Sequence, residues 1–131
     1  MPSVAPPEKA KQEPAVPQVP SLPLVWRHFA SFQPYEPLLA RMQEHVTAIR
    51  QNAAAEAVWL LEHEPVYTGG TSAKLHDLLA PGNVPISYVG RGGQWTWHGP
   101  GQRVAYVMLD LSRRGQDVHA FVHGLESWII A

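Results

Sequence analysis

The most informative stretch of this 131-residue sequence is RGGQWTWHGPGQ, which runs from Arg91 to Gln102. Five of the chain's ten glycines lie between Gly90 and Gly101. Because glycine has no side chain, such a loop lets a ligand lie against backbone amides. Arg91 adds a planar guanidinium that suits a carbonyl or a phosphate group. These features favour a ligand-binding loop, and composition alone leaves open a pair of ordinary hairpin turns.

Aromatic and polar residues alternate inside this stretch. On a strand, alternate side chains point to opposite faces of the sheet. Trp95 and Trp97 should therefore share one face, with Thr96 and His98 on the other. Both tryptophans could also be ordinary core residues.

The flanking sequence predicts several short strands and two helices. Pro34 and Pro37 stand where a helix would begin, and that helix should end near Asn52. Asp117 is a plausible N-cap for a second helix, and Ser72 for a single turn within residues 72–80. The predicted apolar helix faces are Leu39, Met42, Val46 and Ile49, and then Val118, Phe121, Val122, Leu125, Trp128 and Ile129. The predicted strands are 24–32, 57–61, 66–68, 84–89 (interrupted at Pro85) and 103–111.

This order of elements predicts an α+β domain over residues 24–131, with short antiparallel strands and helices to one side. Residues 1–23 hold seven of the thirteen prolines and are predicted to form a disordered tail. The second helix reaches Ala131 without a stop signal, so the domain is expected to be incomplete at its C-terminus.

Composition narrows the function classes. With 45% hydrophobic and 16% charged residues, the composition is that of a globular protein. A net charge of −1 gives no electrostatic reason to expect nucleic acid as a binding partner. The chain contains no cysteine, which excludes disulfides and a cysteine nucleophile within it. No apolar run approaches a membrane span, and no signal peptide is recognised, so a cytoplasmic location is expected. His119 and His123 have metal-compatible spacing but fall on a polar helix face, so no metal and no cofactor is expected.

The stretch 91–102 resembles the signature of lipoyl(octanoyl) transferases: Arg-Gly-Gly, two variable residues, Thr, an aromatic residue, then His-Gly-Pro-Gly-Gln. Every position of that pattern is matched, and Tyr106 follows on the next predicted strand. Residues 61–68 (LEHEPVYT) resemble the family's Leu-Glu-His-x-Pro-x-Tyr-Thr block. Leu109-Asp110-Leu111 with Asp117-Val118 resembles its Leu-Asp-Leu…Asp-Val block. The resemblance runs from about Leu24 to Ala131.

The resemblance implies the biotin/lipoate protein ligase fold, a mixed sheet flanked by helices. It also implies transfer of an octanoyl group from octanoyl-acyl carrier protein to a lysine of lipoyl domains, the first step of endogenous protein lipoylation. The acceptors would be lipoyl domains of 2-oxoacid dehydrogenases and the glycine cleavage H protein. The family's catalytic cysteine and lysine lie C-terminal to the matched portion, so no catalytic residue is expected in this chain.

By the same resemblance, the loop is expected to bind the octanoyl group and its carbonyl, with apolar walls from Trp95, Trp97 and Tyr67. The residues predicted to bind substrate are Arg91, Gly92, Gly93, Gln94, Trp95, Thr96, Trp97 and His98. His63 is expected to be structural and near the site.

Two alternatives stay open. Residues 90–93 loosely resemble the glycine loop of ATP-dependent biotin and lipoate ligases, although those enzymes lack Gly-Pro-Gly-Gln after the histidine. A non-catalytic binding remnant of the same fold is the other alternative.

Overall fold

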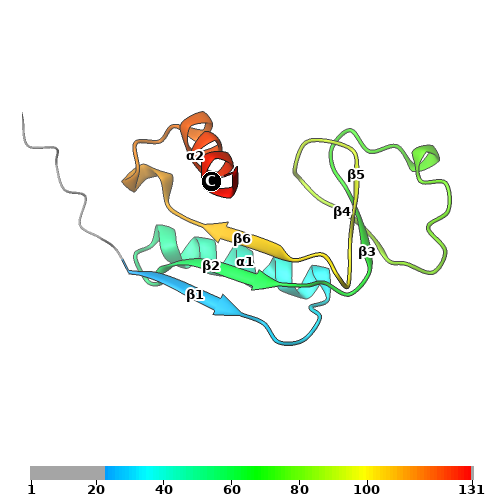
Figure 1. Cartoon of the computed structure of the whole chain (residues 1–131), viewed down its shortest axis with the longest axis horizontal. Helices are drawn as coiled ribbons and strands as arrows, with labels where there is room; N and C mark the ends of the chain where they lie inside the picture. The colour runs from blue at the N-terminus through cyan, green and yellow to red at the C-terminus, as the bar shows by residue number, and fades with distance from the viewer. Residues whose placement is uncertain (1–22, 131) are drawn as a thin grey trace, which may run out of the picture.

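The computed structural model describes residues 23–130, and the predicted tail lies outside them except for Pro23. Figure 1 shows two separate groups of strands joined by the chain. The elements are β1 (Leu24–His28), α1 (Tyr35–Arg50), β2 (Glu56–Leu61), β3 (Val66–Gly69), β4 (Ile86–Tyr88), β5 (Trp95–His98), β6 (Val104–Met108) and α2 (Val118–Ile130), with 3-10 turns at Leu75–Asp77 and Leu111–Arg113.

The first sheet has the order β1-β2-β6, with β1 parallel and β6 antiparallel to β2. Helix α1 is the crossover between the two parallel strands and packs on one face of this sheet (Figure 1). The main hydrophobic core forms between them because alternate residues of β2 meet the apolar side of α1. Its buried members are Leu38, Met42, Ile49, Ala57, Trp59, Leu61 and Met108.

The second sheet has the order β4-β3-β5, again with one parallel and one antiparallel pair. The α+β class and the mixed strand pairing are confirmed. The expectation of short antiparallel strands holds for the β2–β6 and β3–β5 pairs, whereas β1 and β4 each run parallel to their neighbour. Instead of one continuous sheet, the described residues form two three-stranded sheets.

Several predicted boundaries shift. The first strand ends at His28 instead of Phe32, and the strand predicted to reach Leu111 ends at Met108. The Asp110 side chain then accepts a hydrogen bond from the Ser112 amide and starts a 3-10 turn. Ser72 caps nothing, because the short turn at Leu75–Asp77 begins after Lys74 without a side-chain cap.

Helix α1 is also rotated slightly from its predicted orientation. Leu38 is buried, whereas Leu39 is only partly buried. His45 packs against Trp59 with ring centroids 5.5 Å apart. Its Nε2 is 2.9 Å from the carbonyl oxygen of Ala55.

Helix α2 begins as predicted, since the Asp117 carboxylate accepts a hydrogen bond from the Ala120 amide at 3.0 Å. None of its residues is buried. Trp128 contacts Trp26 edge to face, with centroids 6.4 Å apart. Within residues 23–130, no helix combines the length and apolar character that crossing a membrane requires.

Candidate functional site

The loop from Arg91 to Gln94 is fixed through its carbonyl groups. The amides of Gly70, Thr71 and Ser72 donate to the carbonyls of Gln94, Arg91 and Gly93 at 3.0, 2.9 and 3.1 Å. The amides of Gly92 and Gly93, by contrast, donate to no described residue. Both glycines are exposed. The loop therefore presents unused backbone donors at the surface, which is what a ligand-binding loop requires.

Arg91 stabilises this loop from within. Its Nη2 donates to the Thr68 carbonyl at 2.9 Å and to the hydroxyls of Thr68 and Thr96 at 2.8 and 2.9 Å. Its Nη1 donates to the Gly92 carbonyl at 2.9 Å. The two threonine hydroxyls, which are paired across β3 and β5, are themselves 2.6 Å apart. Much of the guanidinium fork is thus engaged by the protein, so Arg91 shapes the loop more than it offers itself to a ligand.

The Thr96 and His98 side of β5 faces a cluster of rings from three other segments. The ring of His98 lies 5.8 Å from that of His63 and 6.4 Å from that of Tyr35, which is nearly parallel to it. The ring of Tyr106 lies 5.7 Å from that of His63. We call Tyr35, His63, His98 and Tyr106 the ring cluster. It forms where the two sheets meet, since Tyr106 belongs to the first sheet and His98 to the second.

Hydrogen bonding fixes the tautomer of His63, which is fully buried. Its Nδ1 lies 2.9 Å from the Gln33 carbonyl, which can only accept, so Nδ1 carries the proton. Its Nε2 therefore accepts a hydrogen bond from the Tyr106 hydroxyl at 2.6 Å. Burial lowers the pKa of His63, with the bond to Gln33 acting in the opposite direction and His98 adding to the lowering. The imidazole is accordingly neutral in the folded protein at pH 7.

The neighbouring phenols are kept protonated. Burial, and secondarily Tyr35, raises the pKa of Tyr106 far above its usual range. Burial also raises the pKa of Tyr35, with the nearby Arg91 opposing that shift. At neutral pH the ring cluster thus carries no phenolate, and its members act by hydrogen bonding.

We expect the free energy of unfolding to fall as pH drops below about 6.5, the usual pKa of histidine. His63 has a lowered pKa in the folded state, so the unfolded chain binds its proton first. The stabilisation is complete above the unfolded pKa and is lost as pH falls toward the folded pKa. Urea denaturation at pH 7.5 and 5.5 measures the difference, which His63→Gln should reduce. An equal pH dependence in both proteins would contradict this assignment.

A turn rich in glycine closes the site after β5. The Glu62 carboxylate accepts a hydrogen bond from the Gly101 amide at 2.7 Å, and Gly101 adopts a φ of +89° that favours glycine. Gln102 then turns back, and its Nε2 donates to the Trp97 carbonyl at 3.1 Å.

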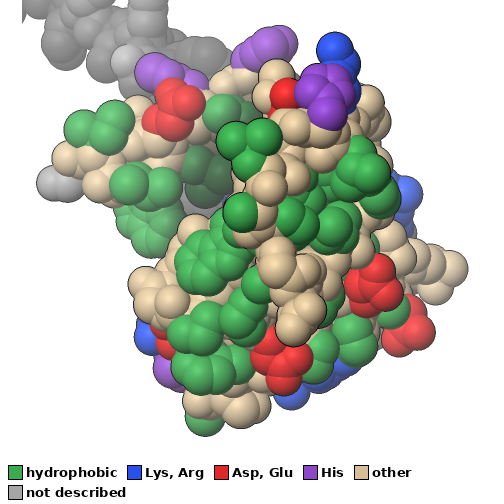
Figure 2. Space-filling model, turned by 90° about the vertical axis from the view of Figure 1, so that its right-hand side faces the viewer, with side chains coloured by type: hydrophobic (Ala, Val, Ile, Leu, Met, Phe, Trp, Pro, Cys, Tyr) green, Lys and Arg blue, Asp and Glu red, His purple; other side chains and the backbone are tan. Residues whose placement is uncertain are grey.

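The two tryptophans lie on the other face of β5, as the alternation predicted. Trp95 lies over Gly69, where an added Cβ would stand 2.7 Å from its ring, and its Nε1 donates to the Lys74 carbonyl at 2.8 Å. Trp97 is paired with Tyr67 and is 40% exposed. Figure 2 shows hydrophobic side chains across the end of the molecule that carries this sheet.

This arrangement divides the predicted site residues. Arg91, Thr96 and His98 lie on the side of the ring cluster, whereas Trp95 and Trp97 lie on the opposite side of the strand. The tryptophans and Tyr67 therefore cannot wall the same space that His98 faces. A separate, mainly apolar pocket of 180 Å³ lies next to Tyr35, between the start of α1 and strands β3 and β4.

The ring cluster was only partly visible in the sequence. His63 and Tyr106 stand in the segments that carry the family resemblance, which is the signal that pointed to them. Tyr35 lies in no such segment, and only the fold brings it to His98.

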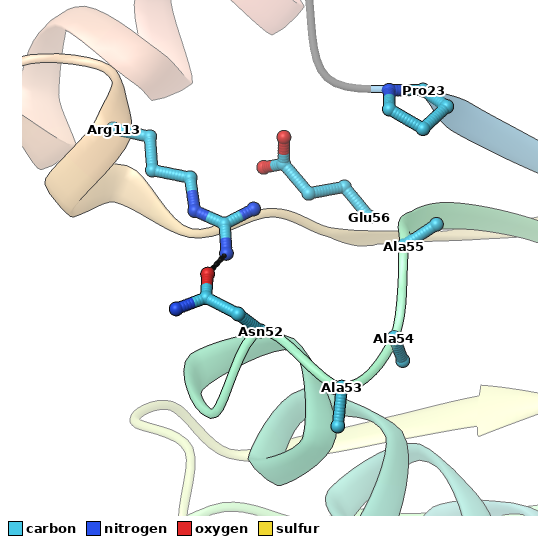
Figure 3. A pocket seen from close by; sticks show the side chains of 7 residues that line it. All are labelled: Pro23, Asn52, Ala53, Ala54, Ala55, Glu56 and Arg113. Carbon is cyan, nitrogen blue, oxygen red and sulfur yellow. Dashed lines mark hydrogen bonds between the residues drawn. The ribbon is translucent and has the colours of Figure 1, made fainter.

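Another pocket, of 340 Å³, lies at the opposite end of β2 (Figure 3). It is lined by Pro23, Asn52, Ala53, Ala54, Ala55, Glu56 and Arg113. Its charged groups already have protein partners: Glu56 pairs with Arg114, and Arg113 donates to the Ile49 carbonyl at the end of α1. We therefore assign this region a structural role. In the part of the chain that the structure describes, no three His, Cys, Asp or Glu side chains are grouped to hold a metal ion.

Comparison with known proteins identifies the family to which the chain belongs. Residues 34–131 match a family described as "Lipoyl protein ligase A/B catalytic domain". An octanoyltransferase of Chelativorans sp. is 57% identical over 116 residues, covering 88% of this chain and 47% of the relative. Octanoyltransferases of Cereibacter sphaeroides and Maricaulis maris are 58% and 56% identical, covering 81% and 80% of this chain and 49% and 46% of the relatives.

The chain thus spans about half the length of the curated relatives it matches. The family match covers the core of the first sheet, the glycine loop and the whole ring cluster. This chain belongs to the lipoyl protein ligase A/B catalytic domain family.

Proposed function

We propose that this chain provides the acyl-binding part of an octanoyltransferase, which moves an octanoyl group from acyl carrier protein to a lysine of lipoyl domains. The observation that carries the proposal is a loop whose exposed Gly92 and Gly93 amides donate to no described residue, and whose Arg91 bonds both the Gly92 carbonyl and the Thr96 hydroxyl on the His98 side of β5. The high identity to proteins named octanoyltransferase supports the choice of acyl group.

The chemistry of acyl transfer explains this set of groups. Attack on a thioester carbonyl places negative charge on its oxygen, and unused backbone amides are suited to stabilise that charge. The amides of Gly92 and Gly93 would donate to this oxygen, while Arg91 holds their loop in shape. The imidazole of His98 would accept a hydrogen bond from the attacking group.

The nucleophile must come from elsewhere. The chain contains no cysteine, and the resemblance implies a cysteine and a lysine C-terminal to this segment. The proposed donor is octanoyl-acyl carrier protein. The proposed acceptors are lipoyl domains of 2-oxoacid dehydrogenases and the glycine cleavage H protein. In it, the residues of this chain bind and orient the acyl group and exclude water.

Titration of the chain with S-octanoyl-pantetheine, followed by amide NMR, tests the binding half of the proposal. We expect the largest shifts at Gly92 and Gly93, because their amides donate to no described residue. Gly92→Trp should weaken binding at least tenfold: space around Gly92 is open, so the side chain is tolerated but covers the loop. Gly124→Trp, on α2 where space is also open, is the matched control.

Unchanged loop signals at saturating thioester would contradict the assignment of this loop. Shifts of the same signals on addition of ATP instead would favour the ligase alternative. Transfer from octanoyl-acyl carrier protein to a lipoyl domain by the complete gene product tests the catalytic half.

A further inference from the structure

We infer that Gln102 is a positioning residue, which fixes His98 in the tautomer that leaves its Nε2 free to accept a hydrogen bond. The inference starts from the orientation of the Gln102 amide. Its Nε2 donates to the Trp97 carbonyl at 3.1 Å, which can only accept. The amide oxygen Oε1 is therefore the atom directed at His98, and it lies within hydrogen-bond distance of Nδ1.

That orientation determines which ring nitrogen of His98 carries the proton. An amide oxygen only accepts, so Nδ1 of His98 must donate to it. In the neutral imidazole the other nitrogen, Nε2, then carries a lone pair and no proton. This nitrogen has no hydrogen-bond partner among residues 23–130.

The comparison with His63 shows why this matters. Both imidazoles carry the proton on Nδ1, His63 through the Gln33 carbonyl and His98 through Gln102. The Nε2 of His63 is occupied by the Tyr106 hydroxyl, whereas that of His98 is free. Of the two rings, only His98 can accept a hydrogen bond from an added group at this position.

The turn between the two residues makes Gln102 well suited to this role. The backbone amide of Gln102 donates to the Gly99 carbonyl at 3.1 Å, and this bond folds the chain back toward His98. Gly101 supports the turn with its positive φ, and Glu62 holds the Gly101 amide. The Gly-Pro-Gly segment thus serves to return the glutamine to the histidine four residues earlier.

The catalytic consequence rests on the proposed function. A lysine amine or a thiol that attacks an acyl carbonyl must lose a proton, and a bare Nε2 can accept it. The other tautomer would present an N–H to the attacking group and could not. We therefore expect Gln102 to act on kcat through His98, without touching the acyl group itself.

The tautomer can be measured directly. In ¹⁵N-labelled protein near pH 9, where imidazoles are neutral, long-range ¹H–¹⁵N spectra should show Nδ1 protonated and Nε2 unprotonated for His98. In Gln102→Leu the signals should shift toward the Nε2-protonated form, while Gln102→Glu, which keeps an acceptor oxygen, should retain the original tautomer. Gln43→Leu, an exposed glutamine on α1, should leave His98 unchanged.

Dispersed amide signals elsewhere in each spectrum establish that a variant is folded. An unchanged tautomer in folded Gln102→Leu would overturn the inference, as would an Nε2-protonated His98 in the parent chain. In the complete gene product, Gln102→Leu should lower kcat at least tenfold with little change in KM, and Gln102→Glu should restore part of it. A shifted tautomer with unchanged kcat would also overturn the positioning role. Absence of octanoyl transfer in the parent would refute the proposed function and leave the tautomer result standing.

Discussion

Glu56→Gln should lower the free energy of unfolding at pH 7 by about 2–4 kcal/mol. The Glu56 side chain is fully buried, and every partner around it is a donor. Its Oε2 accepts from the Asp110 amide at 2.8 Å, and its Oε1 accepts from Arg114 Nη2 at 2.8 Å. Glutamine has nearly the same shape, but its NH₂ group would face one of these donors, and the charge opposite Arg114 would be lost. Figure 3 shows the carboxylate at the start of β2, beside Arg113.

The same carboxylate should give the chain an acid-sensitive stability. Burial alone would raise the pKa of Glu56, but hydrogen bonds from Arg114 and the Asp110 amide outweigh it, so the pKa is lower than usual. The stabilisation is therefore complete above the ordinary glutamate pKa of about 4.3 and is lost as pH falls through the folded value.

Urea denaturation followed by tryptophan fluorescence measures both effects. Glu44→Gln, on the exposed side of α1, is the matched control and should change stability by less than about 0.5 kcal/mol. If Glu56→Gln and Glu44→Gln unfold at the same urea concentration at pH 7, the buried ion pair contributes nothing and the prediction is wrong.

The role of Glu56 also shows what the sequence could not reveal. Its neighbours in the chain, from Ala57 to Leu61, predicted a buried strand correctly. Glu56 lies just outside the predicted strand 57–61, and its partners lie more than fifty residues away in the loop after β6. A local pattern reports burial and periodicity, but it does not show which distant charged residue the fold brings into contact.

The candidate site was also predicted only in part. Alternation within β5 placed the tryptophans and the Thr96–His98 pair on opposite faces, and the structure agrees. The sequence could not tell which of the two faces meets the first sheet, so Trp95, Trp97 and His98 were all assigned to one pocket. The answer depends on how the two sheets meet, which brings Tyr35 and His63 to the side of His98.

Arg91 illustrates the same limit on a smaller scale. Its residue type and its glycine neighbours suggested a group that binds a ligand. Thr68, which lies on β3 and is buried, instead accepts two of its hydrogen bonds. The glycines predicted a loop, and residues 91–94 do lie between strands β4 and β5, whereas the direction of the arginine is set by a strand more than twenty residues earlier.

Gly70→Ala should displace the glycine loop and lower the free energy of unfolding by about 3 kcal/mol. An added Cβ would stand 2.4 Å from the Gly93 carbonyl oxygen, 2.6 Å from that of Gly92 and 2.8 Å from Arg91 Nη1. Two of these three atoms belong to the backbone, so no side-chain rotation can relieve the overlap. The loop must instead move away, which breaks the hydrogen bonds that the 70–72 amides make to its carbonyls.

Gly90→Ala provides the matched control for this prediction. It lies one residue before the same loop, has no positive φ, and its added Cβ meets nothing within 4 Å. We expect it to change stability by less than about 0.5 kcal/mol and to leave the loop signals in place. Urea denaturation and hydrogen exchange at the amides of residues 70–72 measure the two effects together. Because those amides are protected only while the loop carbonyls stay in position, their exchange should accelerate in Gly70→Ala alone. Equal midpoints and equal exchange in the two variants would show that the loop tolerates a side chain at Gly70, and its fixed shape would then no longer explain why the Gly92 and Gly93 amides are held ready for a ligand.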